Sequence, residues 1–301
     1  MDRTAEPPAG RVRAAFLGPA GTFSEEALLA SAAPGAVEPV PAASIYEAVT
    51  SLREGRCELA IVPIENSLEG SINVTLDLLA ERAAEVQIVG EALLRVRHSL
   101  IAAGEVPLTE IATVVSHPQV PGQCTRFLRG ELPGAEIVPA ASTAEAVRSV
   151  VAAGDPHVAA LGTTLAAKIY GATVLREGVE DRSDNETRFV WLARAQDAAR
   201  GAPLRDAGAT ARRRCSIVFW GAGADHAGWL VRCLGEFAER DINLTKIESR
   251  PRREAMGSYM FFADLDRGVD EEPVRAALDG LRGVCEEVRV LGSYAAAAPS
   301  A

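Results

Sequence analysis

Short apolar segments alternate with amphipathic segments from Val12 to about Arg194, and this alternation constrains the fold more than any other feature of the sequence. The apolar segments are too short for helices and rich in valine, isoleucine and leucine, so they predict strands. We expect strands at 14–17, 37–40, 59–64, 86–89, 99–102, 113–115, 136–138, 158–161, 173–175 and 188–192, and helices at 25–32, 45–53, 72–83 and 144–152. This order is typical of an α/β fold, and the segment is long enough for two lobes.

A second unit follows a stretch of different composition. Residues 195–213 are small and polar and lack hydrophobic periodicity, which indicates a linker. Beyond this linker we expect a strand at 214–220, a helix at 229–238, strands at 242–249 and 259–265, a helix at 273–281 and a strand at 284–291. The order βαββαβ is that of a ferredoxin-like domain.

Length, composition and charge exclude several classes of protein. A chain of 301 residues exceeds the usual size of one domain. No apolar run approaches a membrane span and no secretory signal begins the sequence, so we expect no membrane partner, a disordered lead at 1–11 and a flexible tail at 293–301. The net charge of −10 argues against nucleic acid as a partner.

The cysteines indicate the compartment. They are five, scattered, and form neither a CxxC pair nor the spacing of a Cys/His metal site. We therefore expect reduced thiols in a cytoplasmic protein, with no bound metal.

Three predicted helices begin with a capping-box pattern, in which Ser or Thr precedes Glu by three positions. These helix starts lie at Thr22, Ser44 and Ser142, and two of them follow a strand closely. Capping alone would explain each hydroxyl residue. However, helix N-termini beyond the carboxyl ends of strands bind anions in α/β sheets, so several such starts together suggest a cleft for an anion.

Polar residues also gather where predicted strands begin or end. "VPIENSLEGSI" (62–72) and "SHPQ" (116–119) end strands, and "DNETRFVWL" (184–192) leads into one. Together with "GPAGTFS" and "STAEA", in the same order along the chain, these motifs resemble those of prephenate dehydratase. The "ESRP" of 248–251, preceded by "INLTKI", resembles the regulatory ACT domain found in the monofunctional members of that family.

The resemblance implies the architecture. The catalytic domain, 12–194, would be two α/β lobes similar to a type II periplasmic binding protein, with the site between them. Lobe one would comprise 12–89 plus 187–194, and lobe two 90–178. The ACT domain would occupy 214–292. The chain would then cross between the lobes twice, and "DNETRF" would lie at the second crossing.

The resemblance also implies the reaction, in which prephenate loses carbon dioxide and water to give phenylpyruvate. No cofactor is needed for this chemistry. The family's essential threonine corresponds to Thr187, which we expect to donate a hydrogen bond to the departing hydroxyl. Arg188 follows it on the opposite face of the strand, so it either braces the strand or contacts substrate. Glu65, Asn66 and Ser67 would orient substrate or water, or else cap the next helix.

The remaining expected contacts divide into two sets. The substrate set is Gly21, Thr22, Ser24, Ser116, Gln119, Ser142, Thr143 and Phe189, where Phe189 is more typical of a core residue. His117 is of secondary rank, and no role follows for His98, His157 or His226. The effector set, for L-phenylalanine or another aromatic amino acid, is Gly228, Trp229, Leu230, Asn243, Leu244, Glu248, Ser249, Arg250 and Pro251.

Trp229 departs from the family pattern, which has a small alanine at this place. Its indole either points outward, covers the effector pocket, occupies the space of the effector ring, or packs at an interface and leaves binding unchanged. We expect a weaker or different response to phenylalanine. The exposed edge of a ferredoxin-like sheet further predicts a homodimer or homotetramer.

Three alternatives remain open at this point. An arogenate dehydratase would share these motifs, as would a prephenate decarboxylase that keeps the hydroxyl, although the intact Thr187-Arg188-Phe189 favours dehydration. A non-catalytic small-molecule-binding protein would share the two-lobed architecture.

Overall fold

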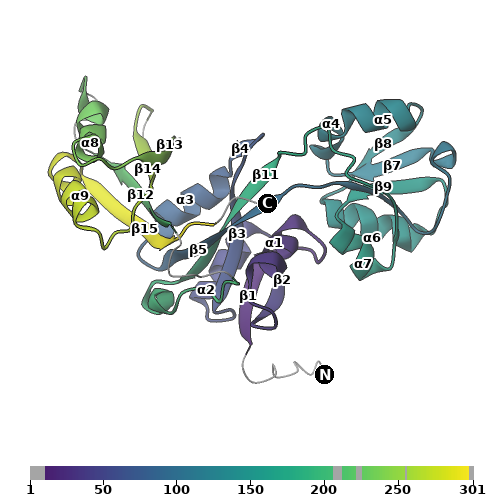
Figure 1. Cartoon of the computed structure of the whole chain (residues 1–301), viewed down its shortest axis with the longest axis horizontal. Helices are drawn as coiled ribbons and strands as arrows, with labels where there is room; N and C mark the ends of the chain where they lie inside the picture. The colour runs from purple at the N-terminus through teal and green to yellow at the C-terminus, as the bar shows by residue number, and fades with distance from the viewer. Residues whose placement is uncertain (1–10, 206–211, 222–225, 255, 298–301) are drawn as a thin grey trace.

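Three units lie in a row in the computed structural model, which describes residues 11–205, 212–221, 226–254 and 256–297 (Figure 1). A central α/β lobe is flanked on one side by a second lobe and on the other by a smaller unit. The expectation of two lobes followed by a ferredoxin-like unit is confirmed. Among the described residues, no helix is both long and apolar enough to cross a bilayer.

Lobe one is the central unit. Its strands are β1 (Val12–Leu17), β2 (Val37–Ala42), β3 (Leu59–Asn66), β4 (Gly70–Ser71), β5 (Val86–Arg95) and β11 (Glu186–Arg194), and its helices are α1 (Phe23–Ser31), α2 (Ile45–Arg53) and α3 (Asn73–Arg82). The strand order is β2-β1-β3-β11-β5, with β4 paired to the end of β3. Strand β11 is antiparallel to both of its neighbours, although it is the last of these strands along the chain.

Lobe two is inserted between β5 and β11. Its sheet has the order β10-β6-β9-β7-β8. The strands are β6 (Ser99–Ala102), β7 (Thr113–Ser116), β8 (Glu136–Pro139), β9 (Val158–Gly162) and β10 (Thr173–Glu177), and the helices are η1 (Leu108–Glu110), α4 (Val120–Gln123), α5 (Thr125–Glu131), α6 (Thr143–Ala153) and α7 (Thr164–Tyr170). Two chain segments connect the lobes, as Figure 1 shows.

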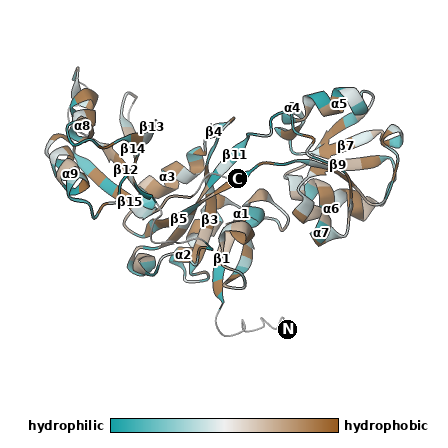
Figure 2. Cartoon of the chain, viewed as in Figure 1, coloured by the Kyte–Doolittle hydropathy of each residue, from teal (hydrophilic) through white to brown (hydrophobic). Residues whose placement is uncertain are grey.

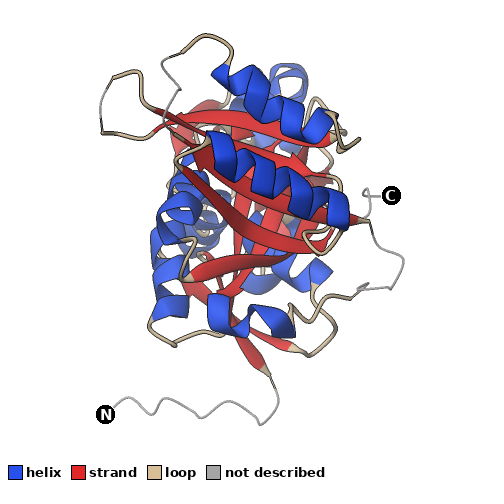
Figure 3. Ribbon diagram, turned by 90° about the vertical axis from the view of Figure 1, so that its left-hand side faces the viewer, coloured by secondary structure: helices blue, strands red, loops and turns tan. Residues whose placement is uncertain are grey.

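The third unit has the predicted order βαββαβ. Its elements are β12 (Arg213–Trp220), α8 (Trp229–Ala238), β13 (Leu244–Pro251), β14 (Tyr259–Leu265), α9 (Glu272–Val284) and β15 (Glu287–Ala295). The strand order β13-β14-β12-β15 is ferredoxin-like. Both helices cover one face of this sheet, as the turned view in Figure 3 shows.

This sheet continues into that of lobe one. Strand β15 pairs with β5 at Gly292 and Ile88, which joins the two sheets into one of ten strands. A Cβ at Gly292 would lie 2.2 Å from the carbonyl oxygen of Ile88, so only glycine permits this approach. Lobe one and the ferredoxin-like unit are therefore joined in one sheet through this single register position, whereas lobe two has its own sheet.

Hydrophobic patterning accounts for these elements. The strands of lobe one carry apolar residues on both faces because α2, α3 and the ferredoxin-like unit cover one face and α1 covers the other. Figure 2 shows the hydropathy of these elements. The predicted caps at Ser44 and Ser142 form, since each hydroxyl accepts a hydrogen bond from the backbone N–H three residues later, at 3.1 Å. Thr22 is the N-cap residue of α1, as predicted, but its hydroxyl donates to the carbonyl of Leu17 at 2.8 Å, so the side-chain cap does not form.

The structure moves several predicted boundaries. Strand β5 continues to Arg95 and pairs with β11 as far as Glu186, so lobe one extends past residue 89 and the first crossing lies near 96–98. Strand β15 runs through Ala295, which places 293–295 in the sheet rather than in a tail. The described part of the expected linker contains the 3-10 helix η2 (Ala195–Arg200), and Leu204 bridges to Ala32 of lobe one. Residues 1–10 of the expected lead at 1–11 lie outside the described residues.

Candidate active site

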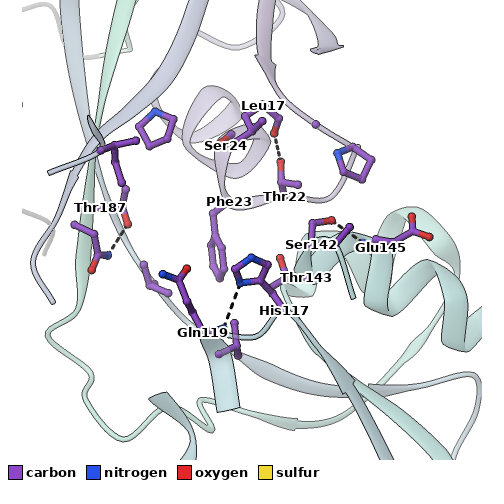
Figure 4. Close-up of a pocket in the computed structure, with 18 of the residues that line it drawn as sticks. Leu17, Thr22, Phe23, Ser24, His117, Gln119, Ser142, Thr143, Glu145 and Thr187 are labelled. Atoms are coloured by element: carbon purple, nitrogen blue, oxygen red, sulfur yellow. Dashed lines mark hydrogen bonds between the residues drawn. The ribbon is translucent and has the colours of Figure 1, made fainter. Parts of the chain in front are cut away.

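A cavity of about 890 Å³ lies between the two lobes and contains most of the predicted substrate residues. Its lining comes from the loop after β1, the end of β3 and the start of β11 in lobe one, and from the ends of β7 and the start of α6 in lobe two (Figure 4). Its volume suits a small organic molecule. The residues predicted from sequence that line it are Thr22, Ser24, Asn66, Gln119, Ser142, Thr143, Thr187 and Phe189.

Thr187 stands on the rigid strand β11 and its hydroxyl is held by an amide. The Asn66 side-chain N–H donates to the Thr187 oxygen at 2.9 Å and also to the Asn185 side-chain oxygen at 2.9 Å. The Asn66 oxygen in turn accepts from the backbone N–H groups of Leu68 and Glu69, which fixes the amide in one orientation. Because the Thr187 oxygen already accepts a hydrogen bond, its own proton is available to a molecule in the cavity.

The loop after β1 forms a second wall and also contacts lobe two. Gly21 has a φ of +87°, and a Cβ there would lie 2.8 Å from the backbone of Ala166 in α7. Its carbonyl accepts from the buried Thr163 hydroxyl at 2.7 Å. This contact places Thr22 and the Phe23 ring at the cavity, where Phe23 points toward His117 and Thr143 (Figure 4). Gly21 therefore holds the lobes together and does not itself line the cavity.

The lobe-two wall carries the cationic group of the site. Arg148 lines the cavity one and a half turns into α6 and forms two hydrogen bonds with Glu145, at 2.8 and 2.7 Å. This pairing raises the pKa of Arg148, chiefly through the hydrogen bond to Glu145. Thr143 contributes its side chain at the first turn of the same helix, where backbone N–H groups are free. This wall offers an anion both a guanidinium and a helix N-terminus.

His98 lines the cavity although its sequence context predicts no role for it. Its ring is 1% exposed, lies edge-on to Phe23 with centroids 5.3 Å apart, and places Nε2 3.2 Å from the Gln123 side-chain oxygen. That oxygen also accepts from the Asn185 amide at 3.3 Å. A continuous set of hydrogen bonds thus extends from His98 through Gln123, Asn185 and Asn66 to Thr187. Since an amide oxygen only accepts, His98 donates its Nε2 hydrogen to Gln123.

The burial of His98 predicts a pH-dependent stability. Burial lowers the pKa of His98 below its ordinary value. Below about pH 6.5 the unfolded chain therefore binds a proton that the folded chain does not, and the free energy of unfolding falls as the pH drops toward the lowered pKa. Urea unfolding near pH 7.5 and pH 5.5 checks this. In His98→Gln the decrease should shrink, whereas His157→Gln, at an exposed position, should keep it.

Several predicted site residues lie elsewhere. Glu65 and Arg188 do not line the cavity: they project from the other face of the sheet, toward the ferredoxin-like unit. This contradicts direct substrate contact by Arg188 and matches the alternative in which it braces the strand, because neighbouring strand residues face opposite sides. Ser67 accepts from the Glu186 backbone N–H at 3.0 Å, and Ser116 is fully buried and does not line the cavity.

The sequence did not predict several cavity residues. They are Phe23, His98, Gln123 and Arg148. Asn185, in the polar stretch that leads into β11, and His117, which had secondary rank, also line the cavity. Arg148 lies on a helix face that is defined only once the lobes meet.

The predicted effector residues of β13 alternate between the two faces of that strand, whereas Trp229 lies in the core of the ferredoxin-like unit. On β13, Glu248 accepts from the Ser71 hydroxyl at 3.1 Å and Arg250 pairs with both oxygens of Asp77, so both side chains contact lobe one. Ser249 and Pro251 point to the other side and are exposed. Trp229 is 3% exposed and lies in the core of its own unit, where its Nε1 donates to the Val284 carbonyl at 2.7 Å. The indole therefore does not point outward.

The fold and the cavity define a two-lobed α/β protein that has a cavity suited to a small molecule between its lobes and a ferredoxin-like unit joined to lobe one. Comparison with known proteins identifies its family. A family model described as "PDT: Prephenate dehydratase" matches residues 14–197. A curated prephenate dehydratase of Mycolicibacterium vanbaalenii is 40% identical over 294 residues, which is 93% of this chain and 90% of that protein. The chain belongs to the prephenate dehydratase family, and it is accordingly an enzyme of the hydro-lyase class.

Solved structures with a similar fold include a member of the same family. A prephenate dehydratase from Arthrobacter aurescens, determined in complex with L-Phe, has a TM-score of 0.83 and 35% identity, covering 96% of this chain and 92% of that one. A protein titled "GqqA- a novel type of quorum quenching acylases" has a TM-score of 0.81 and 29% identity, covering 95% and 98%. A similar fold therefore occurs in proteins that are described by two different activities.

Proposed function

We propose that this enzyme converts prephenate to phenylpyruvate by decarboxylating dehydration, as a step in L-phenylalanine biosynthesis, with Thr187 as the donor to the departing hydroxyl. The observation that carries this proposal is the hydrogen bond from Asn66 to the Thr187 oxygen. It leaves the threonine proton directed away from Asn66, at the wall of the cavity.

The chemistry requires little more than such a donor. Electrons of the breaking bond to the ring carboxylate move into the ring, the bond from C4 to the hydroxyl breaks, and carbon dioxide and hydroxide leave. Aromatisation drives the reaction, so the barrier lies mainly in hydroxide departure. A hydrogen bond from Thr187 that strengthens as negative charge grows on that oxygen lowers the barrier, and one proton taken from the buffered solvent converts the released hydroxide to water.

The two carboxylates of prephenate fit different parts of the cavity. The side-chain carboxylate, which is retained, fits Arg148 and the start of α6 in lobe two. The ring carboxylate fits the apolar region near Phe23, Pro63 and Phe189. Few hydrogen-bond donors there would stabilise its negative charge, so its charge can move into the ring. Such an arrangement favours loss of the ring carboxylate over loss of the retained one.

A direct assay tests the proposal. Purified protein is incubated with prephenate, phenylpyruvate is followed by its absorbance in base, and arogenate is assayed in parallel. Release of phenylpyruvate supports dehydration, and preference for arogenate would assign that substrate instead. A decarboxylated product that keeps its hydroxyl would overturn the proposal, as would binding of prephenate without turnover. Because one structural neighbour is titled an acylase, an N-acylated compound serves as the control substrate.

We also propose that the ferredoxin-like unit is a regulatory ACT domain that binds an aromatic amino acid. The L-Phe complex of the Arthrobacter aurescens relative supports an aromatic ligand. Gly228, with a φ of +82°, is the N-cap residue of α8, and Leu230 and Leu244 pack against the same core as Trp229. Asn243 precedes β13 in the same unit. Because Trp229 fills space inside this unit, we expect a response to phenylalanine that differs from that of relatives with a small residue. Calorimetric titration with phenylalanine, tyrosine and tryptophan, together with activity, tests this.

Assembly gives a further prediction. Strand β13 is an outer edge of the ten-stranded sheet, with Ile247 47% exposed on it and Tyr259 44% exposed on the adjacent β14. Unpaired strand edges favour pairing with another chain. We therefore expect a homodimer or homotetramer. Light scattering at micromolar concentration should give at least twice the mass of one chain, and a monomeric mass would contradict this expectation.

A further inference from the structure

Two consecutive residues of β11 face two different parts of the molecule. Thr187 points into the cavity between the lobes, whereas Arg188 points into the contact between lobe one and the ferredoxin-like unit. Both are buried, at 9% and 8% exposed. Since they share a peptide bond, any shift of the Arg188 backbone moves Thr187 as well.

Arg188 is surrounded by acidic groups from both units. Its guanidinium lies 2.6 Å from Asp264 on β14, 3.0 Å from Glu91 on β5 and 3.4 Å from Glu65 on β3, and it donates to the Tyr294 hydroxyl on β15 at 3.2 Å. Asp264 and Tyr294 are bridged by the buried Ser216 hydroxyl of β12, at 2.5 and 2.7 Å. The ferredoxin-like unit thus supplies the shortest ion pair and the hydroxyl partner of this arginine.

Two further cations complete this cluster. Arg214 of the ferredoxin-like unit lies 2.6 Å from Glu91, and Lys246 of the same unit lies 2.9 Å from Glu65. Each carboxylate of lobe one that faces Arg188 therefore also faces a cation of the other unit. Burial by itself would lower the pKa of Arg188, but the charge of Asp264 and its neighbours raises it above the ordinary value. A buried guanidinium that lost these partners would be destabilised where it stands.

We propose that Arg188 is a positioning residue: its ion pair with Asp264 of the ferredoxin-like unit holds β11 so that Thr187 keeps its place in the cavity. The rate of turnover then depends on how the ferredoxin-like unit sits on lobe one. This inference rests on the proposed role of Thr187. It assigns to a residue of the family motif a contact with the other unit instead of a contact with substrate.

The test changes the partner that lies outside the catalytic lobe. Asp264→Asn keeps the shape of the side chain and removes its charge. Because it leaves the cavity lining intact, we expect kcat for prephenate to fall about tenfold while KM stays within about threefold, since small misplacements of a catalytic group act on the reaction step. Asp264→Glu, which keeps the charge, should recover part of kcat.

A matched control separates positioning from general loosening of the contact. Asp77 of α3 forms another ion pair across the same contact, with Arg250 of β13 at 2.9 Å, and its ion pairs with Arg250 and Arg253 do not involve β11. Asp77→Asn should leave kcat unchanged within about twofold. Hydrogen–deuterium exchange of the peptide 184–194 should quicken in Asp264→Asn and not in Asp77→Asn.

The outcomes are distinct. A lower kcat with faster exchange in Asp264→Asn alone supports the proposal. Unchanged kcat and exchange in Asp264→Asn would overturn it, as would equal effects of the two variants. If the unmodified enzyme does not turn over prephenate, the proposed function fails, and the exchange comparison still decides whether Asp264 holds β11.

Discussion

Thr187→Ala should lower prephenate turnover by about 10²-fold or more while the protein stays folded. The size follows from the loss of one positioned donor at the oxygen on which charge develops. Folding should persist because Thr187 lies at the start of a strand whose pairing with β3 and β5 depends on backbone groups. Steady-state kinetics with prephenate, alongside circular dichroism, measures both quantities. Turnover near that of the unmodified enzyme would remove Thr187 from its proposed role.

Two conservative variants separate the hydroxyl from the shape of the side chain. Thr187→Ser retains the oxygen that accepts from Asn66 and should keep more activity than the alanine variant. Thr187→Val retains the branched shape without the hydroxyl and should behave like alanine. If the valine variant were the more active of the two, packing rather than hydrogen bonding would explain the role of this position.

Trp229→Ala should lower the free energy of unfolding by about 3–5 kcal/mol, the cost typical of removing a buried large aromatic side chain. The indole packs against Phe219 and Phe261, with ring centroids 6.3 and 5.8 Å away, and its Nε1–H is satisfied by Val284. Alanine would leave a cavity and an unpaired carbonyl at the end of α9. Urea denaturation measures this loss.

Two controls bracket the effect of Trp229. Trp229→Phe keeps most of the buried area and loses the Nε1–H donor, so it should cost about 1–3 kcal/mol. Val231→Ala, two positions along the same helix and 72% exposed, should change stability by about 0.5 kcal/mol or less. A small loss in Trp229→Ala, similar to that of Val231→Ala, would show that the indole does not support the core. The phenylalanine variant is also the one in which to titrate amino acids.

Elements with strong local signals could be predicted from the sequence. The helices at 45–53 and 229–238 and the strand at 99–102 have the predicted bounds because apolar spacing and caps define them within a few residues. Strand β5 was predicted too short, since Glu91 and Arg95 interrupt its apolar pattern. Glu91 is nevertheless 4% exposed, because Arg188 and Arg214 compensate its charge. Because Arg188 and Arg214 lie far from Glu91 in the sequence, the residues around Glu91 do not indicate that its charge is compensated.

The residues of the site also differ in whether a local sequence signal marks them. Asn66 and Thr187 could be predicted because they end or begin strands, where polar groups serve no purpose in the core. Gly21 and Arg148 take their roles from the meeting of two lobes: one packs against Ala166 across the gap and the other faces the cavity from α6. Arg188 was placed on the correct face by strand alternation alone, but its partners on β14 and β15 required the fold.

The place of β11 in its sheet also has a consequence for synthesis on the ribosome. Strands β3 and β5 are made early, but the strand that lies between them arrives only after the whole of lobe two, at Glu186–Arg194. Until then the central gap of the first sheet exposes unpaired strand edges and the apolar side chains that Trp191 and Phe189 later cover. Lobe two, by contrast, is continuous in sequence and can fold as soon as it emerges. The nascent chain therefore completes its inserted lobe before the lobe that encloses the insertion, and closure of β11, which carries Thr187, is a late, long-range step in forming the cavity between the lobes.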